Sequence, residues 1–242
     1  MFWQSKRRKK WTTTPSHIII ARNKFIIIRK GRATIIVKEG YPLIIFFGLL
    51  TVVTGLITHP YWAIIPGGFM IFTMFFFRNP KRQINMDKSL LVSPADGRVM
   101  SITDVEDNEF IGEPAQKVTI FLSVFDVHVN RSPIQGEIKF QEYFVGRFKA
   151  AYKTIASFEN ERHAIGIENE KMKVVVVQIA GLIARRIVSW VTLGNVVEKG
   201  QLYGLIKFGS CTELIVPKYV EILVKKGQHV KGGETIIGRI PS

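Results

Sequence analysis

The chain has 242 residues, of which 47% are hydrophobic, and a formal net charge of +15 at pH 7. Its single cysteine, Cys211, excludes an internal disulfide framework and favours an intracellular compartment. The five histidines are not spaced with cysteines or carboxylates as zinc ligands are, so we expect no metal site.

The positive charge is concentrated at the N-terminal end. Residues 1–40 hold eleven Lys and Arg against one acidic residue, whereas residues 83–242 hold twenty against eighteen. A nucleic-acid-binding domain would carry its basic residues over the folded part of the chain, so we expect no nucleic-acid partner. Residues 1–40 are interpreted as a basic N-terminal segment.

Residues 41–77 contain no Lys, Arg, Asp or Glu. One straight helix of this length would measure about 55 Å, which is too long for a single membrane crossing. Pro60 divides the segment into two apolar runs, 43–57 and 61–77, which predicts a helical hairpin that spans or dips into a membrane. Basic residues on both sides place both ends on the cytoplasmic face and would attract anionic lipid. A secretory signal peptide is disfavoured because the apolar region starts late and runs long, while a buried soluble hairpin is the alternative.

Residues 78–242 have the pattern of a mainly β domain with little room for long helices. Short runs rich in Val and Ile are punctuated by Gly and Pro. The stretch "VEKGQ" (197–201) recurs as "VKKGQ" (224–228), which predicts strand-turn-strand units in a β-sandwich like that of lipoyl or biotinyl carrier domains. The lysine that such a carrier presents at a hairpin tip is not visible, and "FGS" (208–210) stands where it is expected.

Three stretches carry candidate site residues: "LVSPADGRV" with Asp96, "FLSVFDVHVNRSP" with His128, and "GLIKFGSCTELIVP" with Ser210. Taken singly, Asp96 is typical of a turn, His128 of a strand, and Gly209-Ser210 of an ordinary turn dipeptide. Taken together and in this order, they resemble phosphatidylserine decarboxylase in its short, membrane-anchored bacterial and archaeal form. The resemblance extends from about residue 35 to the C-terminus and includes "FFFRNPKR", "ENER" and "VKKGQHVKGGETI".

The resemblance implies a pyruvoyl cofactor made from the chain itself. Loss of CO₂ from an amino acid leaves an electron pair at Cα, and an electron sink must be conjugated to the amine. Ser210 would attack the carbonyl of Gly209, and elimination would leave fragments of 209 and 33 residues, the smaller beginning with the pyruvoyl group. His128 would act as the base, and Asp96 would orient and charge-stabilise it, as in hydrolase triads.

One departure from the family pattern concerns histidine. Other branches carry a second histidine three residues after the first, and Arg131 occupies that position here. His128 would then serve both self-cleavage and decarboxylation, or the more distant His163 would contribute.

The sequence therefore favours a membrane-anchored lyase that converts phosphatidylserine, or a related seryl phospholipid, to the ethanolamine lipid. Its partners would be the phospholipid substrate and an anionic membrane surface. The catalytic domain would lie on the cytoplasmic face of the cytoplasmic membrane, as a heterodimer of its own cleavage fragments. The alternative is a non-catalytic membrane adaptor with a lipoyl-like β-sandwich. Diacyl and ether-linked substrates, and any higher oligomer, are left open.

Overall fold

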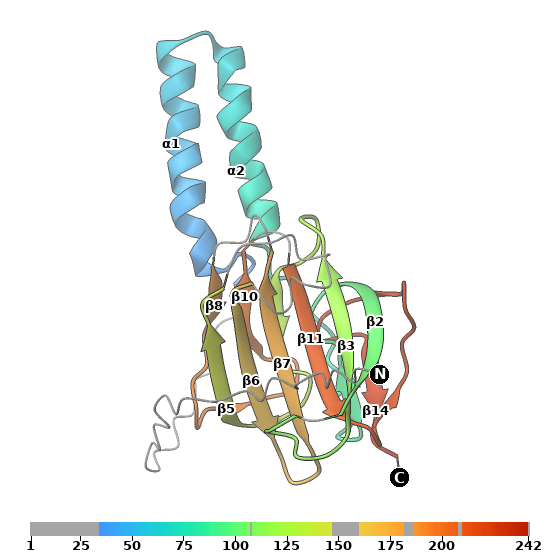
Figure 1. Cartoon of the computed structure of the whole chain (residues 1–242). Coiled ribbons are helices and arrows are strands. Elements are labelled where there is room, and N and C mark those ends of the chain that lie inside the picture. The colour runs from blue at the N-terminus through green and yellow to red at the C-terminus, as the bar shows by residue number, and fades with distance from the viewer. Residues whose placement is uncertain (1–33, 107, 147–159, 182–185, 208–209, 242) are drawn as a thin grey trace, which may run out of the picture.

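The computed structural model describes residues 34–106, 108–146, 160–181, 186–207 and 210–241. A pair of apolar helices rises from one end of a β-rich body (Figure 1). The helical elements are the 3-10 helix η1 (Lys38–Gly40), α1 (Tyr41–Ile57), the 3-10 helix η2 (Pro60–Ala63) and α2 (Ile64–Phe76). The expected helical hairpin is therefore present, and its two helices separate at Pro60 as the sequence predicts.

The strands form one large and two small antiparallel sheets. The eight-stranded sheet has the order β13 (His229–Val230), β2 (Gly97–Val105), β3 (Ala115–Leu122), β11 (Ser210–Pro217), β7 (Lys173–Ala180), β6 (Arg162–Glu168), β5 (Gly136–Phe144), β9 (Val196–Val197). One small sheet has the order β1 (Leu90–Val92), β14 (Ile236–Arg239), β12 (Glu221–Ile222). The other has the order β4 (Val129–Arg131), β10 (Leu202–Ile206), β8 (Ile187–Ser189). The mainly β fold is confirmed.

The main core lies on one face of the large sheet, where Val, Ile and Leu side chains alternate inward along β3, β6, β7 and β11. The strand β11 is buried along its whole length between β3 and β7. Because β11 begins at Ser210, a chain cut before this residue would keep its C-terminal part anchored in the middle of the sheet. The two fragments would then stay together.

The repeated "KGQ" stretches form the same turn. Gly200 and Gly227 both have a positive φ, of 75° and 87°, which glycine adopts without strain. Gln201 and Gln228 each accept the backbone N–H three residues earlier through the side-chain oxygen, at 2.9 and 3.0 Å. The strand-turn-strand repeat is thus a structural repeat, while the closer likeness to lipoyl domains stays a prediction.

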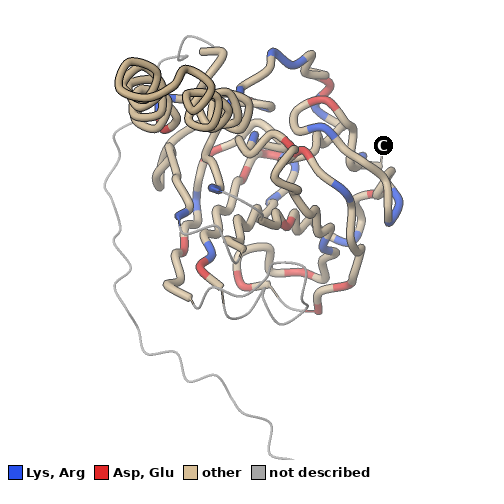
Figure 2. The backbone as a smooth tube through the Cα atoms, turned by 90° about the horizontal axis from the view of Figure 1, so that it is seen from above, with Lys and Arg blue, Asp and Glu red and all other residues tan. Residues whose placement is uncertain are grey.

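The two ends of the hairpin are paired with each other by backbone hydrogen bonds next to the β-body. The N–H of Val37 donates to the carbonyl of Phe77 at 3.0 Å, and the N–H of Asn79 donates to the carbonyl of Ile35 at 2.7 Å. Farther from this junction the hairpin exposes its side chains: α1 has no buried residue. Viewed along the hairpin, the two helices carry no charged residue (Figure 2).

Candidate active site at the base of the hairpin

Ser210 begins β11 at the end of the large sheet nearest the hairpin (Figure 1). It pairs with Leu122 of β3 on one side and Ala180 of β7 on the other. The side chain is fully buried, and its Oγ has no hydrogen-bond partner among the described residues. A buried hydroxyl without a partner is costly, by about 1–3 kcal/mol, so it points to a role in chemistry. Gly209, the other half of the predicted cleavage site, lies outside the described residues.

His128 is fully buried just before β4, and its two ring nitrogens have different surroundings. Nδ1 lies 2.9 Å from the backbone carbonyl of Asp126. A carbonyl only accepts, so Nδ1 carries the proton and donates it, which leaves Nε2 as the basic nitrogen of the neutral ring. Nε2 is itself buried and has no partner among the described residues. Burial lowers the pKa of His128 from 6.5 to about 4, so the ring is a neutral base at pH 7.

Phe76, the last residue of α2, covers the ring of His128. The two ring centroids are 4.1 Å apart with an interplanar angle of 37°. Phe76 and Phe77 are both buried, and they pack with Val129 and Leu205 in a small core beside the histidine. The base of the hairpin is therefore one wall of the site, a contact that the sequence did not predict.

His128 and Ser210 lie in the same region of the molecule. The N–H of Ile206, at the end of β10, donates to the carbonyl of His128 at 3.2 Å. Four residues farther along the chain is Ser210, whose Cα can lie at most about 14 Å from that of Ile206. Both residues therefore lie at the hairpin end of the β-body, and both keep a reactive atom unpaired.

Asp96 is buried at the turn between β1 and β2, but its carboxylate is used elsewhere. Oδ2 forms an ion pair with Arg82 at 2.6 Å, and Oδ1 accepts the backbone N–H of Gly232 at 2.8 Å. Burial raises the pKa of Asp96, and the charge of Arg82 opposes this rise. No hydrogen bond among the described residues joins Asp96 to His128. The structure thus gives His128 a different orienting partner, the carbonyl of Asp126, and the role of Asp96 stays a prediction.

Arg131, which occupies the position of the second histidine, and the more distant His163 both use their side chains in hydrogen bonds. Arg131 donates to the carbonyl of Gly200 at 3.0 Å and to Oδ1 of Asn79 at 2.6 Å, so it ties the end of the hairpin to the β-body. His163 is hydrogen-bonded through both ring nitrogens, to Gln141 at 2.8 Å and Gln178 at 3.2 Å. Both side chains are thus held in hydrogen bonds, and His128 stays the predicted base.

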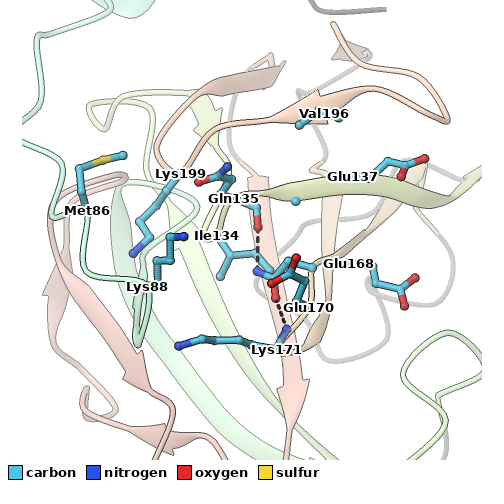
Figure 3. A pocket seen from close by; sticks show the side chains of 12 residues that line it. Met86, Lys88, Ile134, Gln135, Glu137, Glu168, Glu170, Lys171, Val196 and Lys199 are labelled. Carbon is cyan, nitrogen blue, oxygen red and sulfur yellow. Dashed lines mark hydrogen bonds between the residues drawn. The ribbon is translucent and has the colours of Figure 1, made fainter. Parts of the chain in front are cut away.

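A cavity of about 350 Å³ is lined by residues at the end of the large sheet opposite to Ser210. Figure 3 shows its lining from close by. The cavity is bordered by the start of β5 and the end of β6, where Glu168 pairs with Lys173, the first residue of β7. Lys173 is seven residues along β7 from Ala180, the neighbour of Ser210, or about 23 Å away. Asp96, His128 and Ser210 do not line it. Within the described residues, no group of His, Cys, Asp and Glu could hold a metal ion.

Comparison with known proteins agrees with the geometry. The family model described as phosphatidylserine decarboxylase matches residues 69–238. A phosphatidylserine decarboxylase proenzyme of Carboxydothermus hydrogenoformans is 49% identical over 205 residues, which cover 84% of this chain and 95% of the relative. The corresponding proenzyme of Symbiobacterium thermophilum is 46% identical, over 87% of this chain and 98% of the relative. The proenzyme of Syntrophus aciditrophicus is 44% identical, over 84% of this chain and 96% of the relative. With its buried serine, neutral histidine and apolar hairpin, this chain belongs to the phosphatidylserine decarboxylase family.

Proposed function

We propose that this chain decarboxylates phosphatidylserine, or a closely related seryl phospholipid, with a pyruvoyl group that it makes from Ser210. One observation supports this assignment most strongly: the hydroxyl of Ser210 and Nε2 of His128 lie at the same end of the fold, and both are fully buried with no hydrogen-bond partner in the part of the chain that the structure describes. They are the nucleophile and the base that self-cleavage needs. No comparison favours the non-catalytic membrane adaptor.

Self-cleavage begins when Ser210 Oγ attacks the carbonyl carbon of Gly209. Nε2 of His128 takes the hydroxyl proton, and the nitrogen of Ser210 receives a proton as its bond to Gly209 breaks. The product is an ester between Gly209 and the Ser210 side chain. Removal of the Cα proton of Ser210 then breaks the Cβ–O bond and releases Gly209 as a carboxylate. Water replaces the nitrogen of the remaining dehydroalanine, ammonia leaves, and the 33-residue fragment begins with a pyruvoyl group.

The residues around Ser210 fit this group. Its strand neighbours there are Leu122 and Ala180, which add no ionisable side chain beside the new ketone. When formed, the pyruvoyl group supplies the electron sink that stabilises the charge left at the substrate Cα as CO₂ departs. Nε2 of His128 would take a proton from the ammonium group of the substrate and would return it to Cα, and Phe76 and Phe77 help to keep water from the histidine ring. Asp96 supports Ser210 and His128 indirectly. Its carboxylate holds Arg82 and the backbone N–H of Gly232, and Gly232 belongs to the 33-residue fragment.

The substrate lies in a bilayer, and the hairpin brings the site to it. The helical segment Lys38–Ile57 is long and apolar enough to cross a membrane, and Pro60–Phe76 is apolar but shorter. We place residues 41–77 in the cytoplasmic membrane, with residues 78–242 as the decarboxylase domain on its cytoplasmic face. The basic residues that flank the hairpin favour this orientation and an anionic membrane surface.

The assignment is tested by supplying phosphatidylserine in vesicles to the purified full-length chain and measuring release of CO₂. The wild-type chain should form phosphatidylethanolamine, and a Ser210→Ala variant should form none while remaining one folded chain. An equal rate from the Ser210→Ala variant would refute the pyruvoyl mechanism. The same assay with an ether-linked seryl lipid tells which lipid backbone is preferred.

A further inference from the structure

The loop between β3 and β4 forms a tight turn with an exposed aromatic residue. The N–H of Asp126 donates to the carbonyl of Ser123 at 2.9 Å, and the carboxylate of Asp126 accepts the N–H of Ser123 at 2.8 Å. The N–H of Phe125 donates to the hydroxyl of Ser123 at 3.2 Å. These three bonds hold the turn while the side chain of Phe125 is 68% exposed. One exposed phenylalanine is ordinary by itself, and it marks an interaction surface only where other exposed apolar residues lie beside it.

The turn is fastened to the base of the hairpin by Arg78. The guanidinium of Arg78 donates to the carbonyl of Phe75 at 2.7 Å and to the carbonyl of Phe125 at 2.7 Å. It also lies 3.7 Å from the ring centroid of Phe75, which is itself 41% exposed. Phe75, Arg78 and Phe125, linked by these contacts, are called here the aromatic collar. The end of α2 lies where the hairpin leaves the β-body (Figure 1).

We propose that the aromatic collar is a membrane contact, in which Phe125 inserts into the headgroup region of the bilayer that holds the hairpin. The occupant is a phospholipid interface for three reasons. The collar is continuous with the apolar surface of α2, it combines aromatic rings with an arginine, and it lies at the end of the body from which the hairpin projects. Aromatic and arginine side chains are well suited to that depth, with the ring at the level of the headgroups and the charge near phosphate.

The aromatic collar is also connected to the candidate active site through the backbone. Asp126 follows Phe125 directly, and its carbonyl accepts the Nδ1 proton of His128. A bilayer that holds Phe125 in place therefore steadies the carbonyl that sets the tautomer of the base. The inference rests on the proposed membrane attachment of the hairpin and adds a second, short element to it.

The membrane depth of single labelled positions in the full-length chain tests the proposal. A nitroxide is attached to Phe125→Cys, and its collisions with oxygen, which concentrates in lipid, and with a water-soluble nickel reagent are compared in anionic phospholipid vesicles. Cys211 does not compete for the label at pH 7, because it is 3% exposed and burial raises the pKa of its thiol to about 12. Two further labels serve as references. Leu49→Cys in the middle of α1 is the lipid reference, and Tyr219→Cys, just beyond the end of β11 that lies far from the hairpin, is the water reference.

We expect the ratio of oxygen to nickel collisions at Phe125 to lie well above that at Tyr219 and below that at Leu49. A water-like ratio at Phe125 with a lipid-like ratio at Leu49 would refute the membrane contact of the aromatic collar and leave the proposed function intact. A water-like ratio at both positions overturns the membrane attachment and the collar with it. Protection of the Phe125 label from both reagents would identify a protein contact, such as a second copy of the chain, and would also overturn the proposal.

Discussion

Two buried polar regions lie on the same side of the large sheet, and they differ in how their hydrogen-bonding capacity is used. Around His163, an unbroken series of hydrogen bonds runs from His163 to Gln178 at 3.2 Å, from Gln178 to Asn130 at 2.8 Å, and from Asn130 to Thr212 at 3.1 Å. Two residues along β11 from Thr212, the hydroxyl of Ser210 has no partner among the residues that the structure describes, and neither has Nε2 of His128.

The difference separates a structural histidine from a reactive one. A satisfied buried network makes its neighbours rigid and specifies one packing of the sheets. A buried donor or acceptor without a partner costs about 1–3 kcal/mol, and a fold keeps such groups where they gain something else, such as a reaction. We therefore assign the chemistry to Ser210 and His128 and a supporting role to the network around His163. The predictions below test this division, from the largest expected effect to the smallest.

The largest effect is expected at the base. Replacing His128 with Gln or Ala should slow self-cleavage by at least about 10²- to 10⁴-fold, because a positioned base contributes that much to such a step. The matched His163→Gln variant keeps a hydrogen-bonding side chain in the network and should cleave at close to the normal rate. Cleavage is followed on a denaturing gel after synthesis. If His163→Gln abolishes cleavage and His128→Gln does not, the two regions have been assigned the wrong way round.

Asp96 should act through Arg82. An Asp96→Leu variant leaves the buried guanidinium without its closest carboxylate, which typically costs about 3–5 kcal/mol of stability and should slow cleavage. The fraction that matures should keep most of its turnover per pyruvoyl group, titrated with phenylhydrazine. An Arg82→Met, Asp96→Leu double variant removes both charges and should regain much of the lost stability. A double variant that is stable and still fails to cleave would mean that Asp96 takes part in the chemistry directly.

Phe76 should control the protonation of His128. A Phe76→Ala variant loses a buried ring, at a cost of about 3–5 kcal/mol, and lets water reach the imidazole. Burial is the main reason for the low pKa of His128, so its pKa should rise from about 4 toward 6.5. The rate of self-cleavage should then fall between pH 6.5 and 5, where the wild-type chain keeps its rate. Met74→Ala, on the exposed part of the same helix, is the control and should leave this pH profile unchanged.

The same pKa predicts how stability depends on pH. The pKa of His128 is lower in the folded state, about 4, than its ordinary value of 6.5. Below pH 6.5 the unfolded chain binds a proton that the folded chain does not, so stability is lost as the pH falls from 6.5 to 4, by about 3 kcal/mol in total. Urea unfolding of the uncut Ser210→Ala chain in detergent measures this slope. Adding His128→Gln should flatten it, and an unchanged slope would mean that other groups cause it.

Much of the fold could be predicted from the sequence because it depends on local pattern. The uncharged run with Pro60 indicates two helices, and the repeated "KGQ" stretches indicate turns that need a glycine with positive φ. Ser210 and His128 could be named only through the resemblance to a family, since a glycine-serine pair and a strand histidine are common in any β protein.

The contacts that complete the site depend on tertiary packing and left no such signal. Phe76 belongs to an apolar run that is typical of lipid-facing residues, yet it covers His128. The partner of His128 is a backbone carbonyl, which any residue could supply. Arg82 has the position of a charge that flanks a membrane segment, yet it is buried against Asp96.

The central claim is that Ser210 is consumed to make the cofactor, and the intact masses of the purified wild-type and Ser210→Ala chains test it most directly. The wild-type chain should give fragments of 209 and 33 residues, and the smaller should lack a free N-terminal amine and react with phenylhydrazine. The Ser210→Ala chain should stay whole at 27.5 kDa. A wild-type chain that decarboxylates its lipid while remaining a single uncut polypeptide would contradict the account.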